Sequence, residues 1–315
     1  MAKDIYYNTD ESIPEELRDK MPKKMKSRQK KVNRSGFGNF LIIFMLVLVG
    51  IFMALPLYYS VICAFKPLNE LFIFPPRFYV VSPTLDNFRM MWTLTDNLWV
   101  PLSRYIFNSV FTAVSITFLH VVFASMAGFV MEKHRFPGRN GMFNLVQFAL
   151  LFTGGTMAIP QYVVMALMGM INTYWAVILP AVASSLGLFL MKQFMVSSIP
   201  DSMLEAAKID GANEFTVYWK IVMPNVKPAW LTIAIFAFQS SWNATGGNMI
   251  YSESMKLLPT ALGQIFAADA TGVGNIARTG VSMAVSLIMI IPPIVFFVIS
   301  QSNIMETMSH SGMKD

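Results

Sequence analysis

Residues 204–212 read LEAAKIDGA, and residues 221–224 read IVMP. This segment is rich in small residues, carries charged ones, and lies between two long apolar stretches of the chain. An apolar helix that crosses about 30 Å of hydrocarbon at about 1.5 Å per residue needs about twenty residues. The segment is too polar to belong to such a helix. We therefore expect it to lie outside the bilayer and to have a task of its own there.

The composition indicates a membrane protein with several spans. Of the 315 residues, 55% are hydrophobic and 13% are charged, whereas a soluble domain carries roughly a quarter charged residues. The mean hydropathy is +0.51. The single cysteine, Cys63, lies in an apolar run and cannot form an internal disulfide, so we expect a buried packing thiol.

Hydropathy predicts an all-α membrane protein with six transmembrane helices. The predicted spans are 40–64, 106–131, 142–168, 174–196, 228–250 and 280–302. The third and fourth are nearly continuous, with a turn predicted at Asn172 and Thr173. This transmembrane domain, residues 39–305, lies between a basic tail at 1–38 and a C-terminal tail at 306–315.

The distribution of Lys and Arg predicts the orientation. Residues 1–38 hold ten Lys and Arg residues, which alone would suit nucleic acid but beside a span indicate a cytoplasmic flank. The loops at 132–140 and 197–227 are also basic. Both termini are then cytoplasmic, and the connections at 66–105 and 251–279 face outward.

No energy source is visible in the chain. The sequence lacks GxxxxGK[ST], the phosphate-binding loop of many ATPases, and the predicted spans lack the paired charges of proton or sodium relays. His120 is the one imidazole at membrane depth, and a helix–helix hydrogen bond is favoured over a proton-relay role. We predict no catalytic residue, no metal and no cofactor, so a partner must supply the energy.

The polar segment is predicted to form two short helices. Ser198 and Asp201 fit the S-x-x-D pattern of a helix start, which gives a helix from about Ile199 to Ile209. It would end at Gly211, because glycine adopts the left-handed conformation that follows a helix.

Asn213 can cap the second helix, which Pro224 would interrupt. The small side chains at 206, 207, 211 and 212 would let another backbone approach closely. Glu205 and Asp210 offer carboxylates for local hydrogen bonds or for basic partner residues. As an alternative, any polar loop between spans can form a helix–turn–helix of this kind.

The pattern E-A-A-x-x-x-G followed by I-x-x-P resembles the EAA loop of ATP-binding cassette (ABC) transporter permeases. The residues that carry this match are Glu205, Ala206, Ala207, Gly211, Ile221 and Pro224. Over about residues 40–305 the chain is similar to the smaller permease of the maltose-type carbohydrate importers. Further motifs of that likeness are AFKP at 64–67, PTLDNF at 83–88, RFPGR at 135–139, NTYW at 172–175, WN at 242–243 and IPP at 291–293.

The resemblance implies a type I ABC importer permease fold in a bacterial cell membrane. It implies a second permease subunit, two ATPase subunits, an extracytoplasmic solute-binding protein and a sugar as solute, with no role for nucleic acid. The loop at 198–224 would couple to the ATPases through Glu205, Ala206, Ala207, Asp210, Gly211, Ala212, Ile221 and Pro224. The outward loop at 251–279 would contact the binding protein.

The chain departs from the family pattern at two places. After Trp242 and Asn243 it reads ATGGNM at 244–249, where acidic, aromatic and proline residues are usual. Two interpretations stay open: the glycine-rich run loosens the outer end of the fifth span, or it marks a subfamily with a different sugar. The tail at 306–314 replaces a usual glycine-led tail, so contact of this tail with the ATPases is in doubt.

Three residues of the fifth span are candidates for the solute pathway: Gln239, Trp242 and Asn243. Sugars are bound by amides and aromatic platforms. The alternative is an interfacial tryptophan anchor with amides that pack helices together.

The sequence thus predicts the permease subunit of an ABC importer for a mono- or oligosaccharide. One alternative is an ABC permease for another solute. A stand-alone secondary transporter would take up solute alone under an ion gradient, and the missing charges in the spans argue against it. A non-transporting membrane scaffold is a further alternative, which an uptake defect in a knockout strain would exclude.

Overall fold

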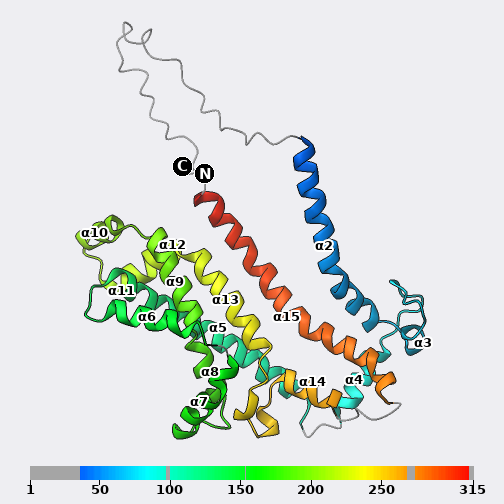
Figure 1. Ribbon diagram of the computed structural model, residues 1–315. Helices are drawn as coiled ribbons and strands as arrows, with labels where there is room; N and C mark the ends of the chain where they lie inside the picture. Colours follow the sequence, from blue (N-terminus) through cyan, green and yellow to red (C-terminus); the bar gives the residue numbers. More distant parts are fainter. Residues whose placement is uncertain (1–35, 97–99, 153, 268–273, 312–315) are drawn as a thin grey trace. The chain divides into compact units, whose positions relative to one another are not determined.

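The computed structural model of the chain describes residues 36–96, 100–152, 154–267 and 274–311. Every regular element in these ranges is a helix (Figure 1). The chain divides into two compact units, residues 1–57 and residues 58–315. Residues 1–35 of the predicted basic tail and 312–315 of the predicted C-terminal tail lie outside the described residues.

The first unit contains one described element, the first part of α2 (Gly36–Ala64). Its side chains are apolar on all faces of the helix. Within that unit they have no second described element to pack against. A helix of this kind is typical of a membrane span whose surroundings are lipid or another subunit.

The second unit holds the remaining helices, which differ widely in length. In chain order they are α3 (Leu68–Leu71), α4 (Asp86–Asp96), α5 (Leu102–Lys133), α6 (Arg139–Ala149), α7 (Gly154–Leu167), α8 (Tyr174–Val182), α9 (Ser185–Ser198), α10 (Asp201–Ile209), α11 (Glu214–Thr216), α12 (Met223–Asn225), α13 (Lys227–Trp242), α14 (Leu258–Ala267) and α15 (Gly274–Ser311). A π-helical turn at Val217–Val222 joins α11 to α12, and 3-10 turns lie at Gly247–Met249 and Glu253–Met255.

The centre of this unit is α5, a helix of 32 residues. It packs against α8, α9 and α13, and α13 in turn packs against α15. The buried face of α5 carries small polar side chains among its apolar ones, including Ser109, Thr112 and Ser125. Small residues allow helices to approach closely in a membrane, where lipid tails are as apolar as leucine.

Two apolar cores lie along α5. One joins the C-terminal part of α5 to α9, α13 and the segment between them, with Phe129, Met191 and Val222 as buried members. The other joins its N-terminal part to α13, α14 and α15, with Tyr105, Trp242 and Val281 as buried members.

Four of the six predicted spans coincide with helices that are long and apolar enough to cross a membrane. These are Phe37–Ala64, Leu102–Lys133, Tyr174–Ser198 and Thr279–Gln301. The candidate span Tyr174–Ser198 counts α8 and α9 together.

The predicted continuous span at 142–168 is broken in the structure. It is divided between α6 and α7, and α7 has 14 residues, fewer than a straight crossing needs. Gly154 and Gly155 are adjacent at the start of α7. Glycine is unfavourable in the interior of a helix, which accounts for a break at this point.

The predicted span at 228–250 is also shorter than expected, because α13 ends at Trp242. Gly246 and Gly247 follow with φ of +75° and +53°, a left-handed backbone that cannot continue a helix. The helix has thus already ended before these glycines, which keep it from resuming toward residue 250. Before α13, the stretch Glu214–Asn225 meets it at 79°, and this bent pair is a fifth candidate span by length and composition.

Candidate functional site

The segment at 198–225, here called the coupling segment after the role that the resemblance implies, forms a helix–turn–helix (Figure 1). Gly211 has φ of +77°, as expected of the residue that ends α10. The side-chain Oδ1 of Asn213 accepts a hydrogen bond from the backbone N–H of Thr216 at 2.8 Å. Both local predictions, the glycine turn and the asparagine cap, are confirmed.

The predicted start of the first helix is wrong. Ser198 is the last residue of α9, and α10 begins at Asp201 after Pro200, without a side-chain cap. The residue before a proline is disfavoured in the helical region, and Ile199 has φ of −120° and ψ of 93°. Pro200 therefore separates two helices, and the S-x-x-D pattern spans that break.

Pro224 does not interrupt the second helical stretch. It lies inside α12, and the helical path continues through Asn225 before the bend at Val226. The turn before α12 is π-helical. Such a turn releases carbonyls from the ordinary helical pairing, so a residue without an N–H does little harm there.

The coupling segment has one buried and one exposed face. Ala207 is 7% exposed and packs with Val217 and Val222 in the core shared with α5, α9 and α13. Burial in that core, and not only close approach by a partner, accounts for an apolar side chain at 207. The other predicted coupling residues are exposed at Glu205, Ala206, Asp210, Gly211 and Pro224 and half-buried at Ala212 and Ile221.

The exposed face also carries large apolar side chains that the sequence analysis missed. Ile209 is 86% exposed, Phe215 69% and Trp219 41%. The rings of Phe215 and Trp219 lie edge to face at 6.2 Å. Their four-residue spacing in a polar loop was a readable signal of one helix face.

Ion pairs and hydrogen bonds fix this segment to the C-terminal end of α5. Lys133 Nζ donates to the carbonyl of Ile199 at 2.6 Å and to Asp201 Oδ1 at 2.7 Å. The ammonium of Lys133 holds the pKa of the Asp201 carboxyl below its usual value. The start of α10 is thereby tied to the end of α5.

A second group of charges joins the same elements. Glu214 lies 3.4 Å from His134 Nε2 and 3.1 Å from Lys208 Nζ. Lys192 Nζ of α9 lies 3.0 Å from Glu132 Oε2, although Glu132 Oε2 lacks hydrogen-bond geometry, so this contact is an ion pair. These charges join the C-terminal end of α5 to the segment at 198–225 and to α9.

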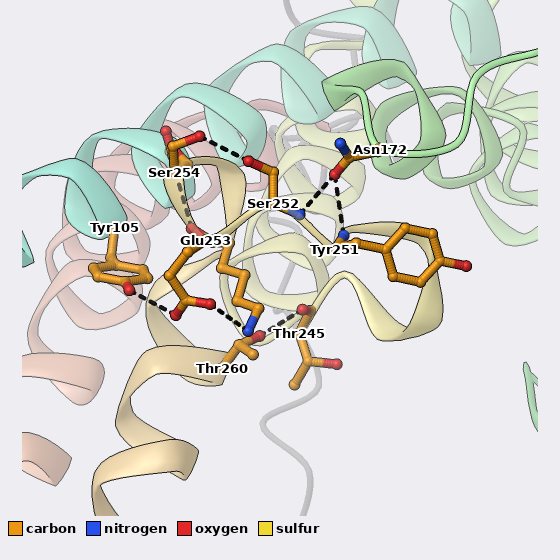
Figure 2. A network of polar contacts seen from close by, with 10 residues as sticks. Tyr105, Asn172, Thr245, Tyr251, Ser252, Glu253, Ser254 and Thr260 are labelled. Carbon is orange, nitrogen blue, oxygen red and sulfur yellow. Dashed lines mark hydrogen bonds and ion pairs between the residues drawn. The ribbon is translucent and has the colours of Figure 1, made fainter. Parts of the chain in front are cut away.

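At its N-terminal end α5 holds the loop at 250–257 (Figure 2). Tyr105 Oη donates to Glu253 Oε1 at 2.8 Å. Asn108 Nδ2 donates to the carbonyls of Ser254 and Lys256, each at 2.9 Å. Asn172 Oδ1 accepts from the backbone N–H groups of residues 251 and 252. The loop is therefore fixed mainly through its backbone.

The three candidate pathway residues do not share one surface. Gln239 and Asn243 are exposed, and Asn243 Nδ2 donates to the carbonyl of Gln239 at 2.9 Å. Trp242 is 2% exposed, and its indole N–H donates to the carbonyl of Met289 in α15 at 3.0 Å. Its ring stacks on Phe238. Trp242 is therefore part of the contact between α13 and α15, whereas the sequence alternative was an interfacial anchor.

The remaining sequence predictions concern single polar residues. His120 Nδ1 lies 2.8 Å from the carbonyl of Val182, which is the predicted helix–helix hydrogen bond. Cys63 is buried. Within the described ranges no three His, Cys, Asp or Glu side chains gather as metal ligands would.

Several known proteins match most of the length of this chain. Protein LplC of Bacillus subtilis is 30% identical over 281 residues, covering 84% of this chain and 91% of that protein. The arabinooligosaccharides transport system permease protein AraQ of Halalkalibacterium halodurans is 29% identical, covering 82% and 90%. The sn-glycerol-3-phosphate transport system permease protein UgpE of Escherichia coli is 29% identical, covering 81% and 91%.

Among solved structures, the chain resembles a subunit of a bacterial ABC transporter involved in the import of the acidic polysaccharide alginate. The TM-score is 0.69 at 22% identity, over 85% of this chain and 98% of that one. This likeness concerns the fold. The model of the family described as binding-protein-dependent transport system inner membrane component matches residues 34–310. The chain belongs to that family of transport permeases.

Proposed function

We propose that this chain is the six-span permease subunit of an ABC importer for a carbohydrate or a similar hydroxyl-rich solute. The observation that carries the proposal is the coupling segment, an exposed helix–turn–helix that is fixed to the end of the central helix α5 by Lys133. Family membership supports it. The chain itself is not an enzyme, and hydrolysis of ATP takes place on partner subunits.

The two remaining spans would be irregular ones. The third would consist of α6 and α7 together, and the fifth of α13 with the bent stretch before it. Non-helical backbone is tolerated at membrane depth where it is buried in protein or lines a cavity. With the basic loops on the inside, both termini are cytoplasmic and the coupling segment faces the cytoplasm.

The exposed face of the coupling segment would receive two ATPase subunits jointly with a second permease. Ile209, Phe215 and Trp219 supply apolar area to this face. Glu205 and Asp210 supply carboxylates beside the turn at Gly211. Large apolar side chains on an otherwise polar surface mark a protein contact. An extracytoplasmic binding protein would deliver the solute on the opposite side.

The solute class is inferred from relatives. Their names include arabinooligosaccharides, polygalacturonan with rhamnogalacturonan, and sn-glycerol-3-phosphate. All of these carry several hydroxyl groups, which favours a sugar or polyol derivative over an unrelated solute. Which of them is carried depends also on the partner permease and the binding protein.

The test is co-purification of the chain with its second permease and its ATPase. Phe215→Asp and Ala206→Asp place a charge on the exposed face and should abolish ATPase association while the protein stays in the membrane. Ala207→Asp is unsuitable, because that side chain is buried. Arg89→Ala is a matched control, since Arg89 is exposed on α4. Full retention of the ATPase by both variants, or solute uptake by this chain alone under an ion gradient, would overturn the proposal.

A further inference from the structure

The span made by α8 and α9 is interrupted at membrane depth. The apolar stretch Tyr174–Ser198 is long enough to cross a bilayer, yet α8 ends at Val182 and α9 begins at Ser185. A break releases backbone carbonyls from helical pairing, and such groups need other partners in hydrocarbon. In transporters, broken helices of this kind lie where the backbone lines a cavity.

His120 of α5 supplies the partner at this break. Its Nδ1 lies 2.8 Å from the carbonyl oxygen of Val182. A carbonyl can only accept a hydrogen bond, so Nδ1 carries the proton and donates it. The other ring nitrogen, Nε2, is then an acceptor in the neutral imidazole.

Gly187 of α9 provides the room for this ring. A Cβ at position 187 would lie 2.0 Å from His120 Nε2, closer than two such atoms can approach. The imidazole therefore lies against the backbone of α9, and it is 4% exposed. The imidazole of His120 fits at this position only because residue 187 has no side chain.

A cavity of about 220 Å³ lies beside the ring, between α5, the α8–α9 break and α13. It is lined by His120, Ser184 and Ser240, together with apolar residues such as Ile233 and Phe236. Ser184 and Ser240 are exposed, and no partner for either hydroxyl is found in the described part of the chain. Ser241 differs, because its hydroxyl donates to the carbonyl of Ala237 at 2.6 Å.

We propose that this cavity is a solute subsite contributed by this subunit, in which His120 Nε2 accepts a hydrogen bond from a hydroxyl group of the solute. Ser184 and Ser240 offer hydroxyls that can donate or accept beside it. Pockets for drug-sized ligands enclose roughly 300–1,000 Å³, so this smaller cavity suits one sugar ring or the end of a longer chain. The inference rests on the proposed function and extends the predicted pathway from Gln239 to the adjacent Ser240.

A proton-relay role is disfavoured by the same geometry. The N–H at Nδ1 donates its hydrogen bond to a backbone carbonyl. A backbone carbonyl does not accept the proton itself and so cannot transfer it onward. Of the residues that line the cavity, His120 alone is titratable. The apolar walls with a few convergent polar groups are typical of a binding site for a small molecule.

The experiment measures uptake by the complete complex, with its binding protein and ATPases, in proteoliposomes. The probe is whichever of arabinotriose, digalacturonate and sn-glycerol-3-phosphate the wild-type complex carries. His120→Asn keeps an amide near the position of Nδ1 for the carbonyl of Val182 but removes the acceptor at Nε2. Loss of one hydrogen bond should raise the KM for uptake about five- to tenfold.

A comparison of serines separates binding from packing. Ser240→Ala should raise the KM in the same direction, whereas Ser241→Ala, whose hydroxyl is bonded to its own helix, should leave it unchanged. Deoxy analogues of the probe give the decisive readout: for one of them, wild type and His120→Asn should be equal, because the partner hydroxyl is already missing. A purely structural role for His120 would impair all analogues alike.

The outcomes distinguish the two proposals. If the wild-type complex carries a probe and neither His120→Asn nor Ser240→Ala changes its KM, the subsite is overturned and the proposed function stands. An equal penalty of His120→Asn on every deoxy analogue also overturns the subsite. If the complex carries none of the probes, the proposed solute class fails and the subsite fails with it.

Discussion

The two ends of α5 are both held by polar contacts, yet the contacts differ in kind. At the N-terminal end, Asn108 is fully buried and donates to two backbone carbonyls of the loop at 250–257. At the C-terminal end, Lys133 and His134 meet the carboxylates of Asp201 and Glu214 in the coupling segment. Lys133, whose side chain is 7% exposed, also donates to the backbone carbonyl of Ile199, so the contrast concerns the carboxylate partners. The side chains of those carboxylates are 80% and 54% exposed.

This difference bears on which end can move. Buried hydrogen bonds to a backbone hold one geometry, and breaking them leaves polar groups unpaired. Exposed ion pairs are weak, are screened by salt and can be remade with water or with another partner. The proposed transmission of motion from an ATPase would need contacts of the second kind. The loop at the other end of α5 has contacts of the first kind, which suit a fixed platform.

The largest effect is expected at the buried end. Asn108→Ala removes both donated hydrogen bonds and also the acceptor of the hydroxyl of Tyr174, which donates to Asn108 Oδ1 at 2.7 Å. Leaving these groups unpaired should lower the free energy of unfolding by about 2–3 kcal/mol. Denaturant or thermal unfolding of the detergent-solubilised protein measures this loss.

Ser254→Ala is the control for that change, because it keeps the carbonyl of residue 254 and removes a hydroxyl bonded only to Ser252. Its effect on the free energy of unfolding should be within about 0.5 kcal/mol. Equal losses for Asn108→Ala and Ser254→Ala would contradict the view that the backbone contacts fix this loop.

A smaller global effect with a clear local one is expected at the exposed end. Lys133→Met keeps the length and apolar stem of the side chain but removes the ammonium that holds Ile199 and Asp201. The loss of unfolding free energy should be less than about half that of Asn108→Ala, since one partner is well exposed. Amide hydrogen exchange in residues 201–209 should nevertheless rise, while exchange in 253–257 stays the same. An equal rise of hydrogen exchange in 201–209 and 253–257 would contradict the proposed difference between the two ends of α5.

Raising the salt concentration should change hydrogen exchange at one end of α5 and not at the other, without any substitution. Raising the ionic strength from about 0.05 to 0.5 M shortens the screening length severalfold. Hydrogen exchange of α10 should increase by a factor of about two, and that of the loop at 250–257 should not change. Lys133→Met should abolish most of the salt dependence in α10. The loop holds an ion pair too, between Lys256 and Glu253, but those side chains are only 18% and 22% exposed. A salt response that is as large in the loop would contradict the assignment of the well-exposed ion pairs to the C-terminal end of α5.

Local signals in the sequence were sufficient for part of the coupling segment. Gly211 and Asn213 act on their own neighbours, through a backbone conformation and through a cap, so the pattern alone predicted both. The S-x-x-D pattern failed because it fits a helix start equally well when a proline within it ends the preceding helix. The four-residue spacing of Phe215 and Trp219 also predicts a shared helix face, but these two residues were not among the predicted site residues.

Helix breaks and contacts between residues far apart in the chain could not be predicted from hydropathy and local motifs. Hydropathy measures whether a stretch is apolar, not where its helix breaks, so the spans at 142–168 and 228–250 were drawn as continuous helices. His120 was predicted to bond to another helix, but its partner at Val182 is 62 positions away. Whether Trp242 would face a pathway or α15 depended likewise on packing that the sequence does not encode locally.

The smallest effect concerns pH at the exposed end. The hydrogen bond from Lys133 lowers the pKa of Asp201 from the usual value of 3.8, so the folded chain favours the ionised carboxyl more than the unfolded chain does. A depressed pKa contributes stability that is fully present above pH 3.8 and is lost as the pH falls through the lower value in the folded state. Hydrogen exchange of α10, corrected for its intrinsic pH dependence, should therefore rise as the pH falls below about 4. Asp201→Asn should remove that rise, whereas an unaltered acid response in Asp201→Asn would mean that another group loosens the coupling segment.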